Sequence, residues 1–150
     1  MKDIAVNRQA YRDYSILEEI ECGIALKGSE VKSIRDGRVN LKDCFARVEE
    51  LGVTAYNIHI SQYAQASYLN VDSVRPRRLL VHKNEMKKLA VQVAQKGCTL
   101  IPLKLYFNSR GFVKATLAVC KGKKQYDKRD DIKRREADME LRRALKNRRK

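Results

Sequence analysis

Residues 99–122, TLIPLKLYFNSRGFVKATLAVCKG, have the pattern of two β-strands joined by a loop. Apolar, β-branched and aromatic residues dominate both halves, and the intervening NSRG consists of residues that favour turns. Pro102 lacks a backbone N–H, so its strand must either lie at the edge of a sheet or contain a bulge there. This segment therefore predicts a hairpin of long strands, the unit from which antiparallel sheets are built.

Three segments upstream show the same strand character. Residues 14–26, YSILEEIECGIAL, begin with partial alternation and end apolar, as expected of a long strand that becomes buried. Residues 43–50, DCFARVEE, and 53–60, VTAYNIHI, alternate in polarity on either side of Leu51 and Gly52. A glycine-containing turn between two alternating segments predicts a second hairpin.

Two segments have helical signals. A short helix is predicted from about residue 30 to 36, because Ser29 can cap its start and Gly37 can end it. A longer amphipathic helix is predicted between Asn84, a candidate cap, and Gly97, since apolar residues recur there at helical spacing. With about five strands joined mainly as hairpins, the fold class is mainly β: an antiparallel sheet closed into a barrel with two to three peripheral helices. An open α+β sandwich of similar content is the alternative.

The charge is strongly positive and unevenly distributed. Lys and Arg number 33 against 18 Asp and Glu, a formal net charge of +15, and residues 121–150 alone contain 14 basic and 6 acidic residues. We therefore divide the chain into a barrel, residues 1–121, and a basic C-terminal tail, residues 122–150. Such a tail attracts polyanions, nucleic acid first and acidic membranes second.

The tail contains no Gly or Pro after Gly122, so a helix from about Asp127 to Asn147 is allowed. Its apolar stripe is thin and its like charges repel, which predicts disorder in the free protein and helix on a polyanionic surface. No apolar run is long enough to span a membrane, and the N-terminus has no secretory pattern. We expect a cytoplasmic protein without membrane association.

Signals of catalysis are absent from the sequence. Gly122-Lys123-Lys124 lacks the first glycine and the Ser or Thr of a phosphate-binding P-loop, and the four cysteines have no zinc-ligand spacing. Cysteines in or beside apolar runs are typical of reduced core residues. We predict no enzymatic activity, no metal and no cofactor.

Binding chemistry is better represented. Arg75, Arg77 and Arg78 form a cluster that, with Lys114 and the tail, could follow a phosphate backbone. Five tyrosines could stack on unpaired bases: Tyr56, Tyr63, Tyr68, Tyr106 and Tyr126. For any single residue, packing or solubility is the commoner role, but the set as a whole favours RNA binding.

Several segments together resemble the SsrA-binding protein (small protein B) family of bacterial trans-translation. The specific ones are GSEVKS at residues 28–33, RRLLVHK at 77–83 and GKKQYDKR at 122–129, and the resemblance covers most of residues 7–135. It implies a barrel of the oligonucleotide-binding (OB) type. It also implies a non-catalytic adaptor that binds the tRNA-like domain of transfer-messenger RNA and accompanies it, with elongation factor Tu, into stalled ribosomes.

By motif, the resemblance implies RNA contacts in the barrel by Asn7, Glu21, Leu80 and Lys114, beside the three arginines. For Asn7 and Glu21 a capping or core-supporting hydrogen bond is the alternative. Phe45 departs from the family, in which a tyrosine is usual. In the tail, contacts with the small-subunit ribosomal RNA of the decoding centre are expected from Lys123, Lys124, Tyr126, Asp127, Lys128, Arg129, Lys133 and Arg134.

Tyr126 has two interpretations. It either stacks on a base of the decoding centre or packs back on the barrel and anchors the tail.

A general RNA-binding ribosomal protein or RNA chaperone would share the basic barrel and tail, and is the alternative function. We expect a monomer.

Overall fold

The computed structural model describes the chain except residues 1–2, 64–70, 123–124 and 149–150; the side chains of residues 125–128, 130 and 131 also lie outside the description. In chain order, the elements are β1 (Asp3–Val6), α1 (Arg8–Asp13), β2 (Tyr14–Ile24), α2 (Gly28–Arg35), β3 (Val39–Asn40), β4 (Phe45–Glu49), β5 (Gly52–Tyr56), β6 (His59–Ile60), β7 (Arg77–Leu80), α3 (Lys83–Lys96), β8 (Thr99–Phe107), β9 (Val113–Gly122) and α4 (Gln125–Arg148).

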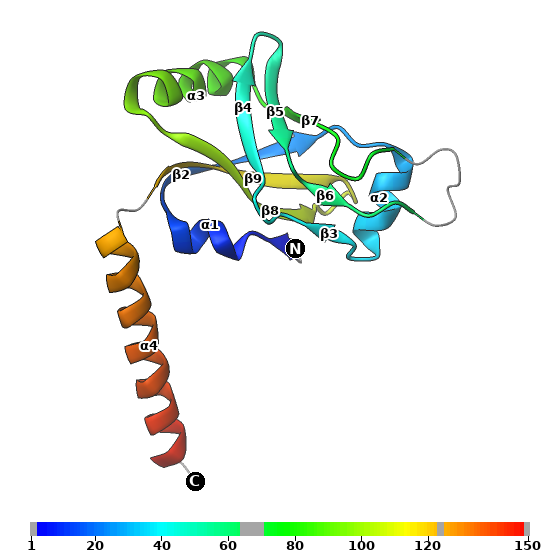
Figure 1. The fold of residues 1–150 in the computed structure, drawn as a ribbon. Coiled ribbons are helices and arrows are strands. Elements are labelled where there is room, and N and C mark those ends of the chain that lie inside the picture. Colours follow the sequence, from blue (N-terminus) through cyan, green and yellow to red (C-terminus); the bar gives the residue numbers. More distant parts are fainter. Residues whose placement is uncertain (1–2, 64–70, 123–124, 149–150) are drawn as a thin grey trace.

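The main sheet closes on itself. Within the described chain, its strand order is β1-β8-β4-β5-β7-β2-β9, and β9 pairs again with β8. Every pairing in this ring is antiparallel, and β1 adds to the edge of β8 beside β4. The predicted antiparallel barrel of the OB type, with helices outside, is confirmed, and the open sandwich is excluded (Figure 1).

The hairpin at residues 99–122 contributes two long neighbouring strands, β8 and β9, to the barrel. β8 and β9 pair from Thr99↔Cys120 to Phe107↔Val113, and the register shifts between Pro102 and Lys104. Because β8 has partners on both sides, the proline is accommodated by a bulge and not at an edge. The inward faces of both strands, including Leu103, Leu105 and Leu117, are fully buried.

Four elements were missed by the sequence analysis: β1, α1, β7 and the two-residue strand β3. β7 follows a long loop and consists of four residues only, so its RRLL sequence gives little periodicity. It nevertheless joins β5 to β2 and so completes the ring. β1 and α1 are also short, at four and six residues.

The predicted strand at residues 53–60 was too long. β5 ends at Tyr56, and Asn57 then adopts a left-handed conformation (φ 62°) that turns the chain away. β6 pairs instead with β3 in a separate two-stranded sheet. Asparagine tolerates this conformation better than most residues, which is why the break occurs there.

The starts of two helices also differ from prediction. α2 begins at Gly28 and not after Ser29, because the Glu30 carboxylate accepts a hydrogen bond from the Lys27 N–H at 2.8 Å. α3 begins at Lys83 and not after Asn84, because Glu85 accepts from the N–H of His82 at 3.3 Å. A glutamate at the third helical position, which accepts from the N–H of the residue before the helix, fixes both starts. The predicted ends, at Gly37 and Gly97, are confirmed, and both glycines have positive φ.

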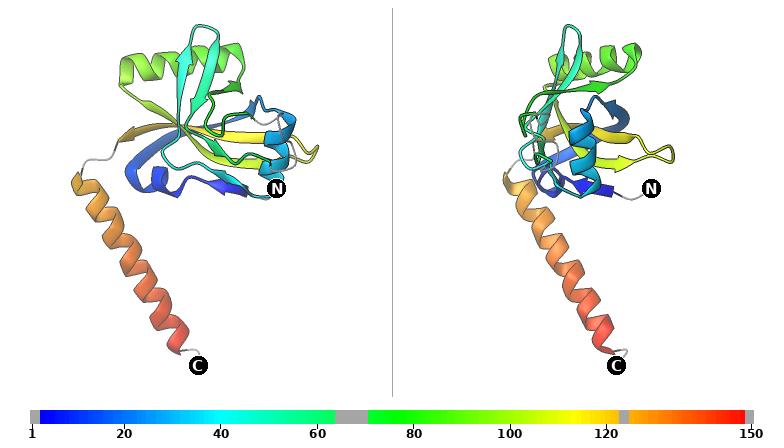
Figure 2. Two further views of the ribbon diagram at one scale, coloured as in Figure 1. Left: turned by 45° about the vertical axis from the view of Figure 1, so that its right-hand side comes forward. Right: turned by 90° about the vertical axis from the view of Figure 1, so that its right-hand side faces the viewer.

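The helices lie outside the barrel at different places. α3 and the tip of the β4–β5 hairpin lie at one end, α1 lies at the other, and α4 extends away on the side of α1 (Figures 1 and 2). α4 agrees with the helix predicted from about residue 127 to 147, and its described side chains are exposed. The conditions under which it forms stay a prediction. No helix in the described ranges is long and apolar enough to cross a membrane.

Candidate nucleic-acid interface

Three of the predicted RNA-binding residues share one outward face of the barrel. Gly23 of β2 lies opposite Leu80 of β7 on one side and opposite Lys114 of β9 on the other. Residues directly opposite in an antiparallel pair point to the same face, and so does Glu21, two positions before Gly23. We call Glu21, Gly23, Leu80 and Lys114 the β2 face.

The β2 face is shaped by its glycine. A Cβ placed on Gly23 would lie 3.2 Å from Cδ1 and 3.3 Å from Cβ of Leu80, so Leu80 leans over the bare backbone. Leu80 is still 56% exposed, which is unusual for a leucine in a strand of the barrel. The exposed Leu80 offers an apolar contact at one side of Gly23, with Lys114 on the opposite side of β2 and Glu21 on β2 itself.

Glu21 is held in place by Tyr106. The Tyr106 hydroxyl donates a hydrogen bond to the Glu21 carboxylate from β8, two strands away. Burial of the phenol, and then the adjacent carboxylate, raise the pKa of Tyr106 to about 12. The hydroxyl therefore remains a donor at physiological pH, and Glu21 keeps an exposed side chain with acceptor capacity to spare.

Asn7 has the structural role that the sequence left open. Its side chain is 4% exposed, and its Oδ1 caps α1 by accepting from the Ala10 N–H at 3.1 Å. Its amide donates to the Pro102 carbonyl at 3.3 Å. Both ends of the side chain are thus engaged, at the bulge of β8 and the start of α1.

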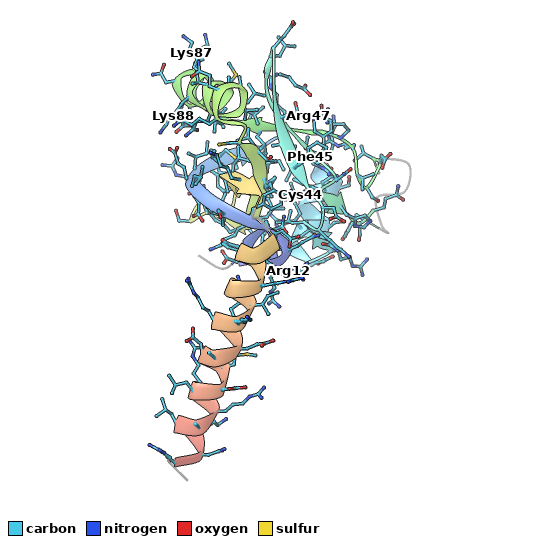
Figure 3. All side chains as sticks on the ribbon, turned by 60° about the vertical axis from the view of Figure 1, so that its left-hand side comes forward. Arg12, Cys44, Phe45, Arg47, Lys87 and Lys88 are labelled. Atoms are coloured by element: carbon cyan, nitrogen blue, oxygen red, sulfur yellow. The ribbon has the colours of Figure 1, made fainter. Side chains whose placement is uncertain are left out.

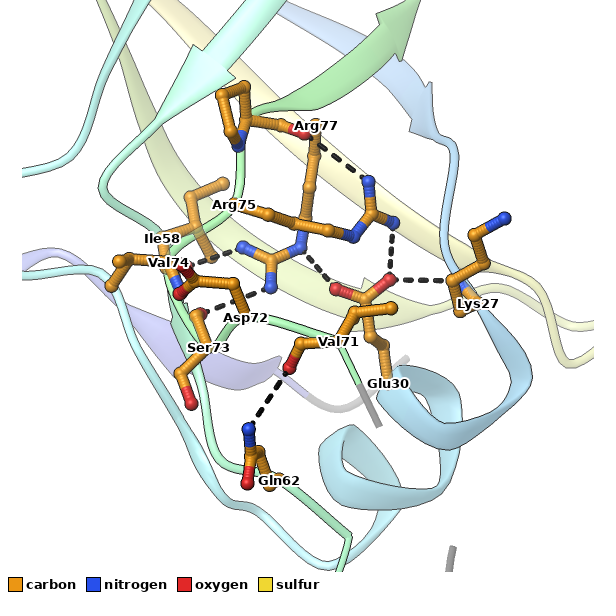
Figure 4. A network of polar contacts seen from close by, with 11 residues as sticks. Lys27, Glu30, Ile58, Gln62, Val71, Asp72, Ser73, Val74, Arg75 and Arg77 are labelled. Carbon is orange, nitrogen blue, oxygen red and sulfur yellow. Dashed lines mark hydrogen bonds and ion pairs between the residues drawn. The ribbon is translucent and has the colours of Figure 1, made fainter. Parts of the chain in front are cut away.

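The arginine cluster requires a correction. Arg77 is fully buried and does not lie on the surface with its neighbours. Its Nε lies 2.5 Å from Oε2 of Glu30, and its other nitrogens donate to the carbonyls of Ile58 and Ser73 (Figure 4). Arg75 binds the other oxygen of the same carboxylate. The strand β7 points alternate residues inward, and Arg77 falls on the inward side.

Arg78 remains exposed and lies on the same outward side as Leu80. Its guanidinium donates to the Leu51 carbonyl and covers Gly52 at the tip of the β4–β5 hairpin. Together with Lys27 and Arg75 it lines a cleft of about 450 Å³ that also contains Glu49. Of the three arginines, Arg78 is therefore the best placed to contact a phosphate.

Most of the described tyrosines have protein partners. Tyr56 stacks on Phe45 with ring centroids 5.4 Å apart, Arg47 lies over both rings, and Tyr56 donates to Glu49. Phe45 and Arg47 lie two positions apart on β4 (Figure 3). Lys32 lies 5.5 Å from the Tyr63 ring centroid. Packing, the commoner role, accounts for these rings, and Tyr68 lies outside the described residues.

The tail residues are described only in part. Arg129, Lys133 and Arg134 project from α4 with exposed side chains. Lys123 and Lys124 lie outside the described residues, and Tyr126, Asp127 and Lys128 belong to α4 without described side chains. The two interpretations of Tyr126 therefore both remain predictions.

Groups suited to metal binding do not gather in the described part of the chain. No three His, Cys, Asp or Glu side chains there are placed to hold a metal ion. All four cysteines are free and buried, as predicted for core residues. Burial raises the pKa of Cys22 and Cys44 to about 12, so neither thiol is poised as a nucleophile.

Comparison with known proteins gives a consistent result. The family model described as SmpB protein matches residues 4–147. An SsrA-binding protein of Caldicellulosiruptor bescii is 58% identical over 146 residues, which is 97% of this chain and 92% of the relative. One from Enterococcus faecalis is 49% identical over 149 residues, covering 99% and 96%.

A solved structure shows the same fold. A chain from "tmRNA-SmpB: a journey to the center of the bacterial ribosome" superimposes with a TM-score of 0.67 at 51% identity, covering 80% of this chain and 84% of its own length. The sequence resemblance and the structural likeness thus point to the same family.

Proposed function

The chain belongs to the SmpB protein family, and we propose that it binds transfer-messenger RNA and acts in trans-translation on the ribosome. The relatives are named as SsrA-binding proteins, and the similar structure is a tmRNA-SmpB complex of the ribosome. The observation that supports this most directly is the β2 face. It brings Glu21, Leu80 and Lys114, which are separated in sequence, onto one exposed surface.

The chemistry of the β2 face suits folded RNA. Lys114 can neutralise a phosphate, and Glu21 can accept from a ribose 2′-hydroxyl or a base amino group. Leu80 can pack against an unstacked base or a sugar. A carboxylate next to RNA is unfavourable unless it accepts such a bond, so Glu21 adds specificity for a particular geometry more than affinity.

We assign a second role to the tail. α4 has 24 residues, so as a straight helix it extends about 36 Å. The barrel holds the tRNA-like domain while the basic tail enters the empty message channel near the decoding centre. An intact message would occupy the same path, so the tail senses a stalled ribosome by competition for space.

The protein acts as an adaptor and performs no chemistry itself. Elongation factor Tu joins it and the RNA in the delivery complex, and the complex works in the cytoplasm. These features rest on the role that the names of the related SsrA-binding proteins indicate.

Competition binding tests the proposal. Labelled transfer-messenger RNA is bound to the full chain and displaced with unlabelled transfer-messenger RNA or bulk tRNA. We expect strong preference for the former, and about tenfold weaker binding for Leu80→Ala and Lys114→Gln, a loss typical of one good contact. Lys87→Gln, an exposed lysine on α3, is the matched control. Equal competition by bulk tRNA would instead indicate a general RNA-binding protein.

A further inference from the structure

A second cationic surface lies where the tail helix meets the barrel. A cavity of about 620 Å³ is lined by Arg8 and Arg12 of α1, Lys42 of the β3–β4 connection and Arg135 of α4. Among the described residues, none that lines this cavity is acidic. We call these four residues the junction pocket. In Figure 3, Arg12 lies beside the start of α4.

Most of this positive charge is not neutralised by the acidic side chains that the structure describes. Arg12 forms an ion pair with Asp13 at 3.2 Å. Arg8, Lys42 and Arg135 have no ion pair with a described acidic side chain. Cations that converge on one cavity repel each other and raise its potential, so the pocket favours an anion over water.

Local structure holds the barrel side of the pocket rigidly. Asn7 caps α1 and bonds to the β8 bulge, which fixes the helix that presents Arg8 and Arg12. Asn40 accepts from the Lys42 N–H at 2.8 Å, which fixes the turn that presents Lys42. The amides of Asn40 and Gln9 also line the cavity and add neutral hydrogen-bond donors.

We propose that the junction pocket binds a backbone phosphate of RNA, held by Arg8 and Lys42 from the barrel and by Arg135 from the tail helix. A guanidinium group can donate two parallel hydrogen bonds to two oxygens of a phosphate. Three cations from separate elements can surround a single phosphate. The phosphate then bridges the barrel and α4 and sets the direction in which the tail leaves. This inference rests on the proposed function, since it takes RNA as the partner.

The pocket is separate from the β2 face. β9 and β8 lie between β2 and β1, and the pocket includes Val6, the last residue of β1. The phosphate therefore belongs either to the transfer-messenger RNA, as it wraps around the barrel, or to ribosomal RNA next to the tail. The chemistry is the same in both cases, and experiment separates them.

The test compares two double variants that remove the same charge from exposed positions. Arg8→Gln with Lys42→Gln alters the pocket, and Lys83→Gln with Lys87→Gln on α3 is the control. Binding of the full chain to the tRNA-like domain and to ribosomes is measured between 50 and 200 mM salt. We expect the pocket variant to bind about five- to tenfold more weakly, with a salt slope smaller by about 1, relative to the control.

The two RNAs identify the source of the phosphate. A loss confined to the tRNA-like domain assigns it to transfer-messenger RNA, and a loss confined to ribosomes assigns it to ribosomal RNA. Equal affinity and slope for pocket and control variants on both RNAs would overturn the proposal. Lys114→Gln serves as reference: if it weakens binding while the pocket variant does not, the proposed function stands and only the pocket is refuted.

A double-mutant cycle tests the bridging role of Arg135. If Arg8 and Arg135 hold the same phosphate, losing either contact removes much of what the other contributes. Arg8→Gln and Arg135→Gln combined should therefore lose less affinity than the product of the two single losses. Strictly multiplicative losses would show that Arg135 does not share the site.

Discussion

Arg77 and Glu30 form a fully buried ion pair that ties β7 to α2, with Nε and Oε2 2.5 Å apart and both side chains at most 3% exposed. Arg75 binds the second oxygen of the same carboxylate. The single carboxylate of Glu30 therefore pairs with two guanidinium groups next to β7, the strand that completes the barrel.

Removing the carboxylate should destabilise the fold strongly. Glu30→Gln leaves Arg77 as a buried charge without a counterion, which costs about 3–5 kcal/mol. Glu18→Gln, which breaks the exposed pair with Lys88 at 2.7 Å, is the control and should cost less than about 1 kcal/mol. Urea unfolding measures both free energies, and similar small losses would contradict the structural role assigned to Glu30.

The same pair predicts a dependence of stability on acid pH. Burial raises the pKa of Glu30, but hydrogen bonds from Arg75, the Lys27 N–H and Arg77 outweigh it, so the net shift is downward. The pKa of a glutamate in the unfolded chain is about 4.3. The stabilisation is therefore complete above that value and is lost as the pH falls through the lower value of the folded state.

Urea unfolding at a series of pH values checks this dependence. The difference in unfolding free energy between wild type and Glu30→Gln should be constant from neutral pH to about pH 5 and shrink below about pH 4. A difference that persists unchanged to pH 3 would show that the carboxylate has no lowered pKa.

Gly23 should matter for RNA binding more than for stability. A Cβ in Gly23→Ala meets Leu80 at 3.2 Å, and because Leu80 is exposed its side chain can move away. We expect a stability change below about 1 kcal/mol, and a several-fold loss of affinity for transfer-messenger RNA because the apolar contact is displaced. Gly122→Ala, where a Cβ meets nothing within 4 Å, is the control.

Asn7 should act through α1. Asn7→Ala removes the cap and the bond to the Pro102 carbonyl and should cost about 1–2 kcal/mol, whereas Asn7→Ser keeps a capping oxygen and should recover part of it. RNA affinity measured on the folded variants should follow the same order, since α1 presents Arg8. If Ser loses as much affinity as Ala while restoring stability, Asn7 contacts RNA directly.

These residues show which features of the structure could be predicted from the sequence. The strand hairpins and the ends of α2 and α3 follow from local pattern and were predicted, and for Pro102 the pattern predicted either an edge or a bulge. The inward position of Arg77 depends on the register of a four-residue strand that has no periodicity of its own. The grouping of Arg8, Lys42 and Arg135 arises from elements distant in sequence, so only the closed barrel reveals it.

Removing the tail should separate RNA binding from tagging. The cut belongs after Gly122, because β9 continues to that residue and pairs with Tyr14 of β2; ending at Cys120 would shorten the barrel. The truncated chain should keep the β2 face and bind transfer-messenger RNA within about tenfold of wild type, because at most the Arg135 contact is lost, yet fail to support peptide tagging on stalled ribosomes. Loss of affinity and tagging together on truncation, or of neither, would contradict the division of labour between barrel and tail.

Within the full chain, Tyr126→Phe and Tyr126→Ala test the stacking interpretation, since a phenylalanine ring can still stack and alanine cannot. Stacking predicts that Phe supports tagging and Ala does not, with RNA affinity unchanged in both.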